Sequence, residues 1–264
     1  MHGTRIPCLS HWLAALAALA CLLACHLAHA ASAVLIWPIN PVLEADEPAT
    51  ALWLENRGER DVTLQIRVLA WSQAGFKDVY AQQRAVIASP PFVTVSPGSR
   101  QLVRLMRQGA EQPAAEDAYR VLIDEVPQGD DAARRQAGLT LQLQMRYSVP
   151  LFVSAPGIWT QERPDRPRSA DTATRPQLTW RVEQADGQRF LLVRNQGKVH
   201  ARLSQVRWQG TAGQPLVLID GLLGYVLPGQ QMRWPLPAGV QPGGGMQLHA
   251  KLADNAPSVT IPSF

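Results

Sequence analysis

One stretch decides the fold of this chain: Leu139-Thr140-Leu141-Gln142-Leu143-Gln144-Met145-Arg146-Tyr147-Ser148-Val149, continuing through Pro150 into Leu151-Phe152-Val153. Apolar residues occupy every odd position from 139 to 149, and polar residues stand between them. In a β-strand, a period of two places each row of side chains on one face. The pattern therefore predicts a long strand.

The apolar row of this strand has an unusual composition. It begins with Leu139, Leu141, Leu143 and Met145 instead of the Val, Ile and Tyr that suit a half-buried sheet surface. Such long, flexible side chains favour insertion into pockets. The stretch alone leaves a second interpretation open, in which it is an ordinary core strand of a β-sandwich.

Length and composition indicate two globular all-β domains. The chain has 264 residues, which exceeds the usual size of one domain. With 46% hydrophobic and 17% charged residues it can bury a core, and 21 Pro and 19 Gly punctuate short alternating runs. We therefore expect an all-β protein.

The first 30 residues are typical of a secretory signal peptide. Arg5 supplies the positive start and 12–23 is an apolar run. Ala28-His29-Ala30 has the form of a cleavage site, with Ala31-Ser32-Ala33 as a neighbouring alternative. No other stretch approaches the ~18 uninterrupted apolar residues needed to span a bilayer, so we expect an exported protein without stable membrane insertion.

A lipid anchor is the alternative to simple cleavage. Leu22-Leu23-Ala24-Cys25 resembles the lipobox of bacterial lipoproteins, in which the cysteine is lipidated and becomes the mature N-terminus. The later small-x-small site is equally acceptable and leads to a soluble protein.

Removal of the leader would remove all three cysteines, Cys8, Cys21 and Cys25. The remaining chain would hold two histidines, His200 and His249. Disulfides, thiol catalysis and cysteine-based metal sites are then excluded. Two histidines so far apart are more often surface or core residues than ligands, so we expect neither a metal nor a cofactor.

Residues 31–153 are expected to form the first domain. Pro38 and Pro41 restrict the first strand to a sheet edge or to a crossing between sheets. Asn56-Arg57-Gly58-Glu59 predicts a turn, which suggests a hairpin between its flanking strands. So many short strands in roughly 120 residues fit an immunoglobulin-like sandwich. The strands are expected at 33–37, 50–56, 62–71, 84–88, 92–95, 101–106, 118–123 and 139–153.

A proline-rich polar segment, 154–176, predicts a linker or mobile loop, and alternating runs in 177–264 predict a second all-β domain. Residues 31–153 carry 12 basic and 14 acidic residues, a net charge of −2, and 154–264 carry 12 and 7, a net charge of +5. The excess is scattered and no aromatic platform accompanies it, which argues against nucleic-acid binding.

Several short landmarks follow one another along the chain. They are Trp71, Ser89-Pro90-Pro91, Ser96-Pro97-Gly98, Val103-Arg104-Leu105, Glu125-Val126-Pro127, Leu151-Phe152, the segment 195–201 and Leu227-Pro228-Gly229. In this order they resemble the periplasmic pilus chaperones of the chaperone–usher pathway, which have two immunoglobulin-like domains set at an angle. The pattern is most similar to the archaic branch, related to spore-coat-type pili.

The resemblance implies a mechanism. Pilus chaperones lend one strand to a pilus subunit whose own sandwich lacks a strand, and deliver the subunit to an outer-membrane usher. Alignment on Leu151-Phe152 makes Leu139, Leu141, Leu143 and Met145 the inserted residues. An added strand satisfies the unpaired backbone of the subunit while alternate side chains fill its groove.

The subunit's terminal carboxylate is anchored in the better-known relatives by two basic residues. Their positions correspond here to Asn40 and Pro150, so the usual anchor is missing. A carboxylate still needs a cationic partner, which Arg120 or Arg146 can supply through paired hydrogen bonds. Arg104 is the next candidate.

Two other classes of function compete with the chaperone. One is a structural or adhesive surface protein of two immunoglobulin-like domains, anchored at Cys25. The other is an enzyme, but Asp124 and Glu125 are adjacent on a strand, so they point to opposite faces and make a poor acid–base pair. We therefore expect no catalysis.

Overall fold

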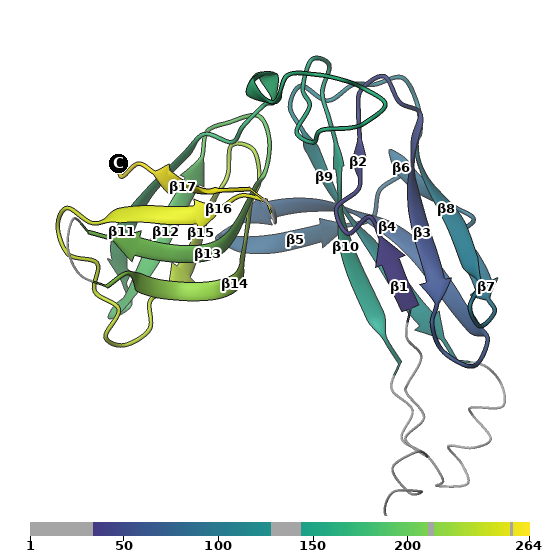
Figure 1. Cartoon of the computed structure of the whole chain (residues 1–264), viewed down its shortest axis with the longest axis horizontal. Helices are drawn as coiled ribbons and strands as arrows, with labels where there is room; N and C mark the ends of the chain where they lie inside the picture. The colour runs from purple at the N-terminus through teal and green to yellow at the C-terminus, as the bar shows by residue number, and fades with distance from the viewer. Residues whose placement is uncertain (1–33, 128–143, 211–213, 254–255) are drawn as a thin grey trace, which may run out of the picture.

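The protein consists of two β-sandwiches in a computed structural model, which describes residues 34–127, 144–210, 214–253 and 256–264. The two units lie side by side at an angle (Figure 1). The strands are β1 (Val34–Trp37), β2 (Val42–Leu43), β3 (Ala49–Asn56), β4 (Val62–Ala74), β5 (Lys77–Ala81), β6 (Val86–Ser89), β7 (Phe92–Val95), β8 (Arg100–Arg107), β9 (Asp117–Val126), β10 (Arg146–Val153), β11 (Leu178–Ala185), β12 (Gln188–Asn195), β13 (Ala201–Gln209), β14 (Leu216–Val226), β15 (Gln231–Pro235), β16 (Gln247–Lys251) and β17 (Ser258–Ile261).

The first sandwich packs a sheet of order β1-β3-β8-β6 against one of order β2-β10-β9-β4-β5, with β7 also paired to β4. Strand β4 shows why these residues form sheets: its apolar residues alternate with polar ones and are the buried set from Val62 to Val68. Leu64 and Ile66 face Leu52, Val103 and Leu105 of the other sheet within one core. The prediction of an immunoglobulin-like sandwich is confirmed.

The first strand crosses between the sheets, as its prolines predict. Among the described strands, β1 pairs with β3 alone, at the edge of one sheet. After Pro38 and Pro41 the chain enters the other sheet, where β2 runs parallel to the end of β10. Proline has no N–H to donate and is therefore tolerated where the chain leaves one ladder for another.

The predicted hairpin between 50–56 and 62–71 is wrong. β3 and β4 belong to opposite sheets. The cause is Asn56, which is buried at the end of β3 and donates from Nδ2 to the carbonyls of Arg60 (2.6 Å) and Val95 (2.8 Å). Its Oδ1 accepts from the N–H of Gly58 at 2.8 Å. These bonds turn the chain across the sandwich instead of back along the same sheet.

The second sandwich repeats this corner. Its sheets have the orders β11-β12-β15 and β14-β13-β16-β17. Asn195, buried at the end of β12, donates from Nδ2 to the carbonyls of Val199 (2.8 Å) and Val226 (3.0 Å) and accepts from Gly197 N–H at 2.9 Å. The chain then enters β13 in the facing sheet. The all-β prediction for 177–264 is confirmed.

The connection between the sandwiches packs against the first of them. Trp159 is buried, and Arg168 lies over its ring at 4.4 Å. Arg168 also donates to both carboxylate oxygens of the buried Glu44, at 3.0 and 2.6 Å. Arg163 pairs with Glu47, and Arg166 binds the nearby acidic residues at 2.8–3.4 Å. Ion pairs therefore fix the segment for which the sequence predicts a linker or mobile loop.

The structure also bears on the membrane prediction. Among the residues that it describes, none forms a helix of the length and hydrophobicity that membrane crossing requires. The leader, including Cys25, lies outside the described residues.

Candidate functional site

Strand β10 divides its side chains between the two faces of its sheet. Val149, Leu151 and Val153 are buried in the first core, with Tyr147 packed against them. The even-numbered residues Arg146 and Ser148 are exposed on the opposite face. The apolar row of the sequence is thus the core-facing row, as the period of two predicts.

The row leaves the core at Met145. This side chain is 40% exposed, whereas Val149, four positions further along the same row, is 7% exposed. Residues Leu139, Leu141 and Leu143, which are predicted to be inserted into a partner, lie outside the described residues. Met145 is therefore the one predicted insertion residue whose position can be described, and it is accessible to a partner.

The outer edge of β10 is largely unpaired within the described part of the chain. Its inner edge pairs with β9 along its whole length. On the outer side it meets β2 only at Phe152 and Val153. On that outer side no described strand lies beside the residues from Arg146 to Pro150, and β1 is likewise a free edge of the facing sheet. This side of the sandwich is open to an added strand.

A cavity of about 430 Å³ lies where β10 approaches the second sandwich. Asn40 and Pro150, the two positions aligned with the missing anchor, both line it. So do Arg120 of β9 and Arg202 of β13. Arg120 stands opposite Pro150 in the strand register. The cavity thus has two guanidinium groups, one from each sandwich, together with one carboxylate, Asp78, which accepts hydrogen bonds from Trp71 and Gln73.

Aromatic rings hold Arg120 in place. Its guanidinium carbon lies 3.9 Å from the ring centroid of Trp71 and 5.3 Å from that of Tyr225. The Nε atom is buried and has no hydrogen-bond partner among the described residues. An anion entering the cavity would therefore meet a pre-positioned cation.

Arg146 occupies a different place. It is 64% exposed and paired with Asp124, which Arg67 also binds at 2.7 Å. Burial alone would raise the pKa of Asp124, but the hydrogen bonds from Arg146 and Arg67 outweigh it, and the pKa lies below its usual value. Arg146 is four residues from Pro150, about 13 Å along the strand. The structure therefore brings Arg120 together with Arg202 and not with Arg146.

Sequence reasoning missed Arg202. It follows the Asn-x-Gly corner of the second sandwich, but only the packing of the two sandwiches places it near Arg120. Arg104, the other basic candidate, is exposed on β8 in the facing sheet.

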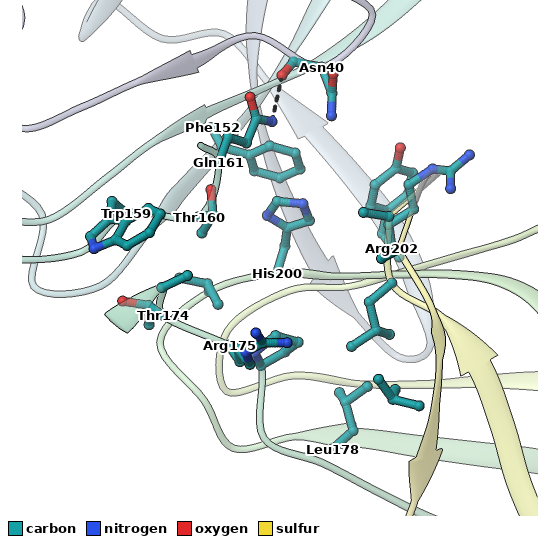
Figure 2. A pocket seen from close by; sticks show the side chains of 18 of the residues that line it. Asn40, Phe152, Trp159, Thr160, Gln161, Thr174, Arg175, Leu178, His200 and Arg202 are labelled. Atoms are coloured by element: carbon teal, nitrogen blue, oxygen red, sulfur yellow. Dashed lines mark hydrogen bonds between the residues drawn. The ribbon is translucent and has the colours of Figure 1, made fainter. Parts of the chain in front are cut away.

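A larger cavity, about 850 Å³, adjoins the small one and shares Asn40, Arg202 and Tyr225 with it. Figure 2 shows its centre, where the rings of Phe152 and His200 stack with centroids 3.5 Å apart and planes 3° apart. Gln161 of the connection closes one side by donating to the carbonyl of Asn40 at 3.2 Å. Both cavities are parts of one cleft between the sandwiches.

His200 also joins the two sandwiches. Its backbone N–H donates to Oε1 of Glu116 at 2.8 Å, and its ring atom Nδ1 lies 2.7 Å from the same oxygen. Glu116 N–H donates to the carbonyl of Lys198 at 3.0 Å. His249 is elsewhere, beside Thr260. The two histidines therefore share no site, and the described residues contain no cluster of three or more potential metal-binding His, Cys, Asp or Glu side chains.

Comparison with solved structures supports the sequence landmarks. The chain is 30% identical to the CsuC chaperone in the CsuC–CsuE chaperone–tip adhesion subunit pre-assembly complex, from the archaic chaperone–usher Csu pili of Acinetobacter baumannii. The match covers 88% of this chain and 99% of the other, with a TM-score of 0.67.

More distant structures share the fold. The Salmonella enterica complex of SafA pilin with the SafB chaperone matches at 19% identity, over 89% of this chain and 98% of the other, with a TM-score of 0.60. The E. coli chaperone DraB matches at 18% identity, over the same shares, with a TM-score of 0.58. No curated protein sequence matches significantly.

The family comparison covers the first sandwich. Residues 38–158 match the family of pili and flagellar-assembly chaperones, at its PapD N-terminal domain. This range contains β10, and it also contains Arg120, which the first sandwich contributes to the small cavity. The chain therefore belongs to the pilus-assembly chaperones of the chaperone–usher pathway, as its sequence landmarks predict.

Proposed function

We propose that this protein works in the periplasm, where it completes the fold of exported pilus subunits by lending them the strand that begins at Leu139, and passes them to an outer-membrane usher. The observation that carries this proposal is the outer edge of β10, which is unpaired from Arg146 to Pro150 among the described residues, together with the exposure of Met145, where the apolar row leaves the core. A surface protein of two complete sandwiches would have no use for such an edge, which invites unwanted pairing.

The lent residues account for the affinity. Leu139, Leu141, Leu143 and Met145 continue the alternating apolar row in the sequence, and we expect their side chains to fill an apolar groove of the subunit. Each buried side chain contributes roughly 1.5–3 kcal/mol, from which the cost of ordering the strand is subtracted. Backbone hydrogen bonds along the free edge add to this sum. No catalytic group takes part.

The register of the lent strand needs an end-stop, because a slip of two residues keeps the same apolar face. Arg120 and Arg202 supply it by binding the subunit's terminal carboxylate in the small cavity. This cavity lies at Pro150, five residues beyond Met145. Arg146 pairs with Asp124 at the other end of β10 and is therefore the comparison residue.

We expect Arg120→Met and Arg202→Met each to lower subunit capture at least tenfold, about 1.4 kcal/mol. Methionine keeps the apolar packing against Trp71 and Tyr225, so the melting temperature of the free chaperone should change little. Amidation of the subunit's C-terminus should reproduce the loss. Capture is measured by copurification of a tagged chaperone with its subunit.

The matched substitution Arg146→Met should leave capture unchanged, although the sequence alone makes Arg146 an equal candidate. A double Arg120→Met, Arg202→Met variant that captures normally would place the anchor elsewhere, with Arg104 the next residue to test.

The exported form is expected to begin at residue 31 or 34, after cleavage at either small-x-small site, because a carrier has to move between the inner membrane and the usher. Intact mass spectrometry of protein released from the periplasm reads this directly. A diacylglyceryl group on Cys25 would instead favour the anchored surface protein.

A further inference from the structure

The β4–β5 hairpin leaves its own sandwich. β4 pairs with β9 from Thr63 to Ala70, and from Ala70 to Ala74 its one partner within the described part of the chain is β5. All five side chains of β5 are exposed. In Figure 1 the hairpin reaches across to the second sandwich. Because an isolated two-stranded ribbon is at best marginally stable, contacts with that sandwich have to hold it.

Gln73 makes the central contact. It is 5% exposed and lies against the end of β14. Its Nε2 donates to the carbonyl of Tyr225, and its Oε1 accepts from the N–H of Leu227, both at 2.9 Å. The side-chain amide thus pairs with the second sandwich as a backbone amide would. The other Nε2 proton goes to Oδ1 of Asp78 at 2.9 Å, which fixes the orientation of the amide.

The tip of the hairpin is strained. Gly75 and Phe76 form its two-residue turn with φ of 58° and 62°. A left-handed backbone is natural for glycine but unfavourable for a bulky aromatic residue. The ring of Phe76 lies 4.6 Å from the guanidinium carbon of Arg233, which also lies over Phe190 at 4.4 Å. The contact across the interface therefore offsets the strain.

The hairpin is also connected to the small cavity. Oδ1 of Asp78 accepts from Nε1 of Trp71 at 2.9 Å, and the Trp71 ring is the surface on which Arg120 lies. Tyr225, whose carbonyl Gln73 binds, contributes the second ring beside Arg120. One carboxylate thus orients both the amide that holds the second sandwich and the indole that positions the arginine.

We propose that the β4–β5 hairpin is a strut that sets the angle between the sandwiches, with Gln73, Phe76 and Asp78 as its positioning residues. By fixing that angle the strut keeps Arg202 in one cavity with Arg120. Without it, the second sandwich turns about its other attachments, which are the Glu116–His200 hydrogen bonds, the Phe152–His200 ring stack and the apolar contact of Ala118 and Phe152 with Leu227. The effect on subunit capture rests on the function proposed above, whereas the effect on the angle does not.

The strut predicts that two glycine substitutions shift the melting temperature in opposite directions: Phe76→Gly should lower it, whereas Asp186→Gly should raise it. Phe76→Gly relieves the strained turn, so a free hairpin would melt at a higher temperature. A strut would instead lose its terminal contact, and we expect a lower melting temperature and a larger radius of gyration by small-angle X-ray scattering. Asp186→Gly is the matched control. Asp186 and Gly187 form a similar turn between β11 and β12 with φ of 51° and 76°, exposed to solvent.

Gln73→Glu separates hydrogen bonding from packing, because glutamate has the same size but cannot donate to the carbonyl of Tyr225. We expect the radius of gyration of the free protein to increase, as it does for Phe76→Gly, and subunit capture to fall at least tenfold. Val79→Thr, on exposed β5, should change neither.

Scattering curves identical to wild type for both Gln73→Glu and Phe76→Gly would overturn the strut, whatever the capture result. Capture that fails already in the wild-type protein would contradict the proposed function and leave the scattering test valid.

Discussion

Leu143→Asp is expected to abolish recovery of the subunit while it leaves the melting temperature of the chaperone within about 2 °C of wild type. The substituted carboxylate would have to enter an apolar groove of the subunit, and burial of an unpaired charge costs more than the whole contact provides. Coexpression with the subunit, followed by affinity purification, measures recovery. Leu141→Asp should behave in the same way.

The control lies in the same strand and the same row. Leu151 is fully buried in the first core, so Leu151→Asp should unfold the first sandwich. If the row at 139–145 is also core, as the alternative interpretation of the sequence holds, Leu143→Asp will unfold the chaperone as Leu151→Asp does. Thermal melting of the two purified variants distinguishes the interpretations before any subunit is added.

Asn56→Ala and Asn195→Ala should each lower the free energy of unfolding by about 3 kcal/mol. Each asparagine supplies three hydrogen bonds to backbone groups, and removal leaves buried donors and acceptors that cost roughly 1–3 kcal/mol apiece. Urea unfolding followed by tryptophan fluorescence gives the values. Gln184→Ala, on the exposed surface of β11, should change stability by less than about 0.5 kcal/mol.

Aspartate at either corner tests the geometry. It matches asparagine in size but cannot donate to the two carbonyls, so Asn56→Asp should destabilise the protein at neutral pH at least as much as Asn56→Ala. Normal stability of Asn56→Asp would show that the corner depends on shape instead of hydrogen bonding.

These corners also show what the sequence could predict. Asn56 and Gly58 are turn residues, and the turn is present, but turn chemistry does not say whether the next strand returns to the same sheet. That choice depends on Val95, which is distant in sequence and supplies the carbonyl that Asn56 binds. Pro38 and Pro41 were more informative, because a missing N–H is a property of the residue itself and restricts the strand directly.

In the candidate site, too, the sequence predicts the features that depend on local pattern and misses those that depend on distant contacts. The period of two predicts which face of β10 holds Met145 and Leu151, since alternation is local. Arg202 could not be predicted, because its place beside Arg120 is set by the packing of one sandwich against the other. The β4–β5 hairpin was missed for a related reason: all of β5 is exposed, so it has no alternating pattern, and only the second sandwich explains it.

The arginine-rich connection changes where the first sandwich ends as an autonomous folding unit. Glu44 is 6% exposed, and its charge is balanced by Arg166 and Arg168, which follow the last strand of that sandwich by more than ten residues. A fragment cut after Val153 would keep the buried anion and lose its tethered counterions, a change that typically costs 3–5 kcal/mol. We therefore expect the shortest self-sufficient form of the first sandwich to extend through Arg168, which thermal melting of fragments ending at Val153 and at Arg168 would test.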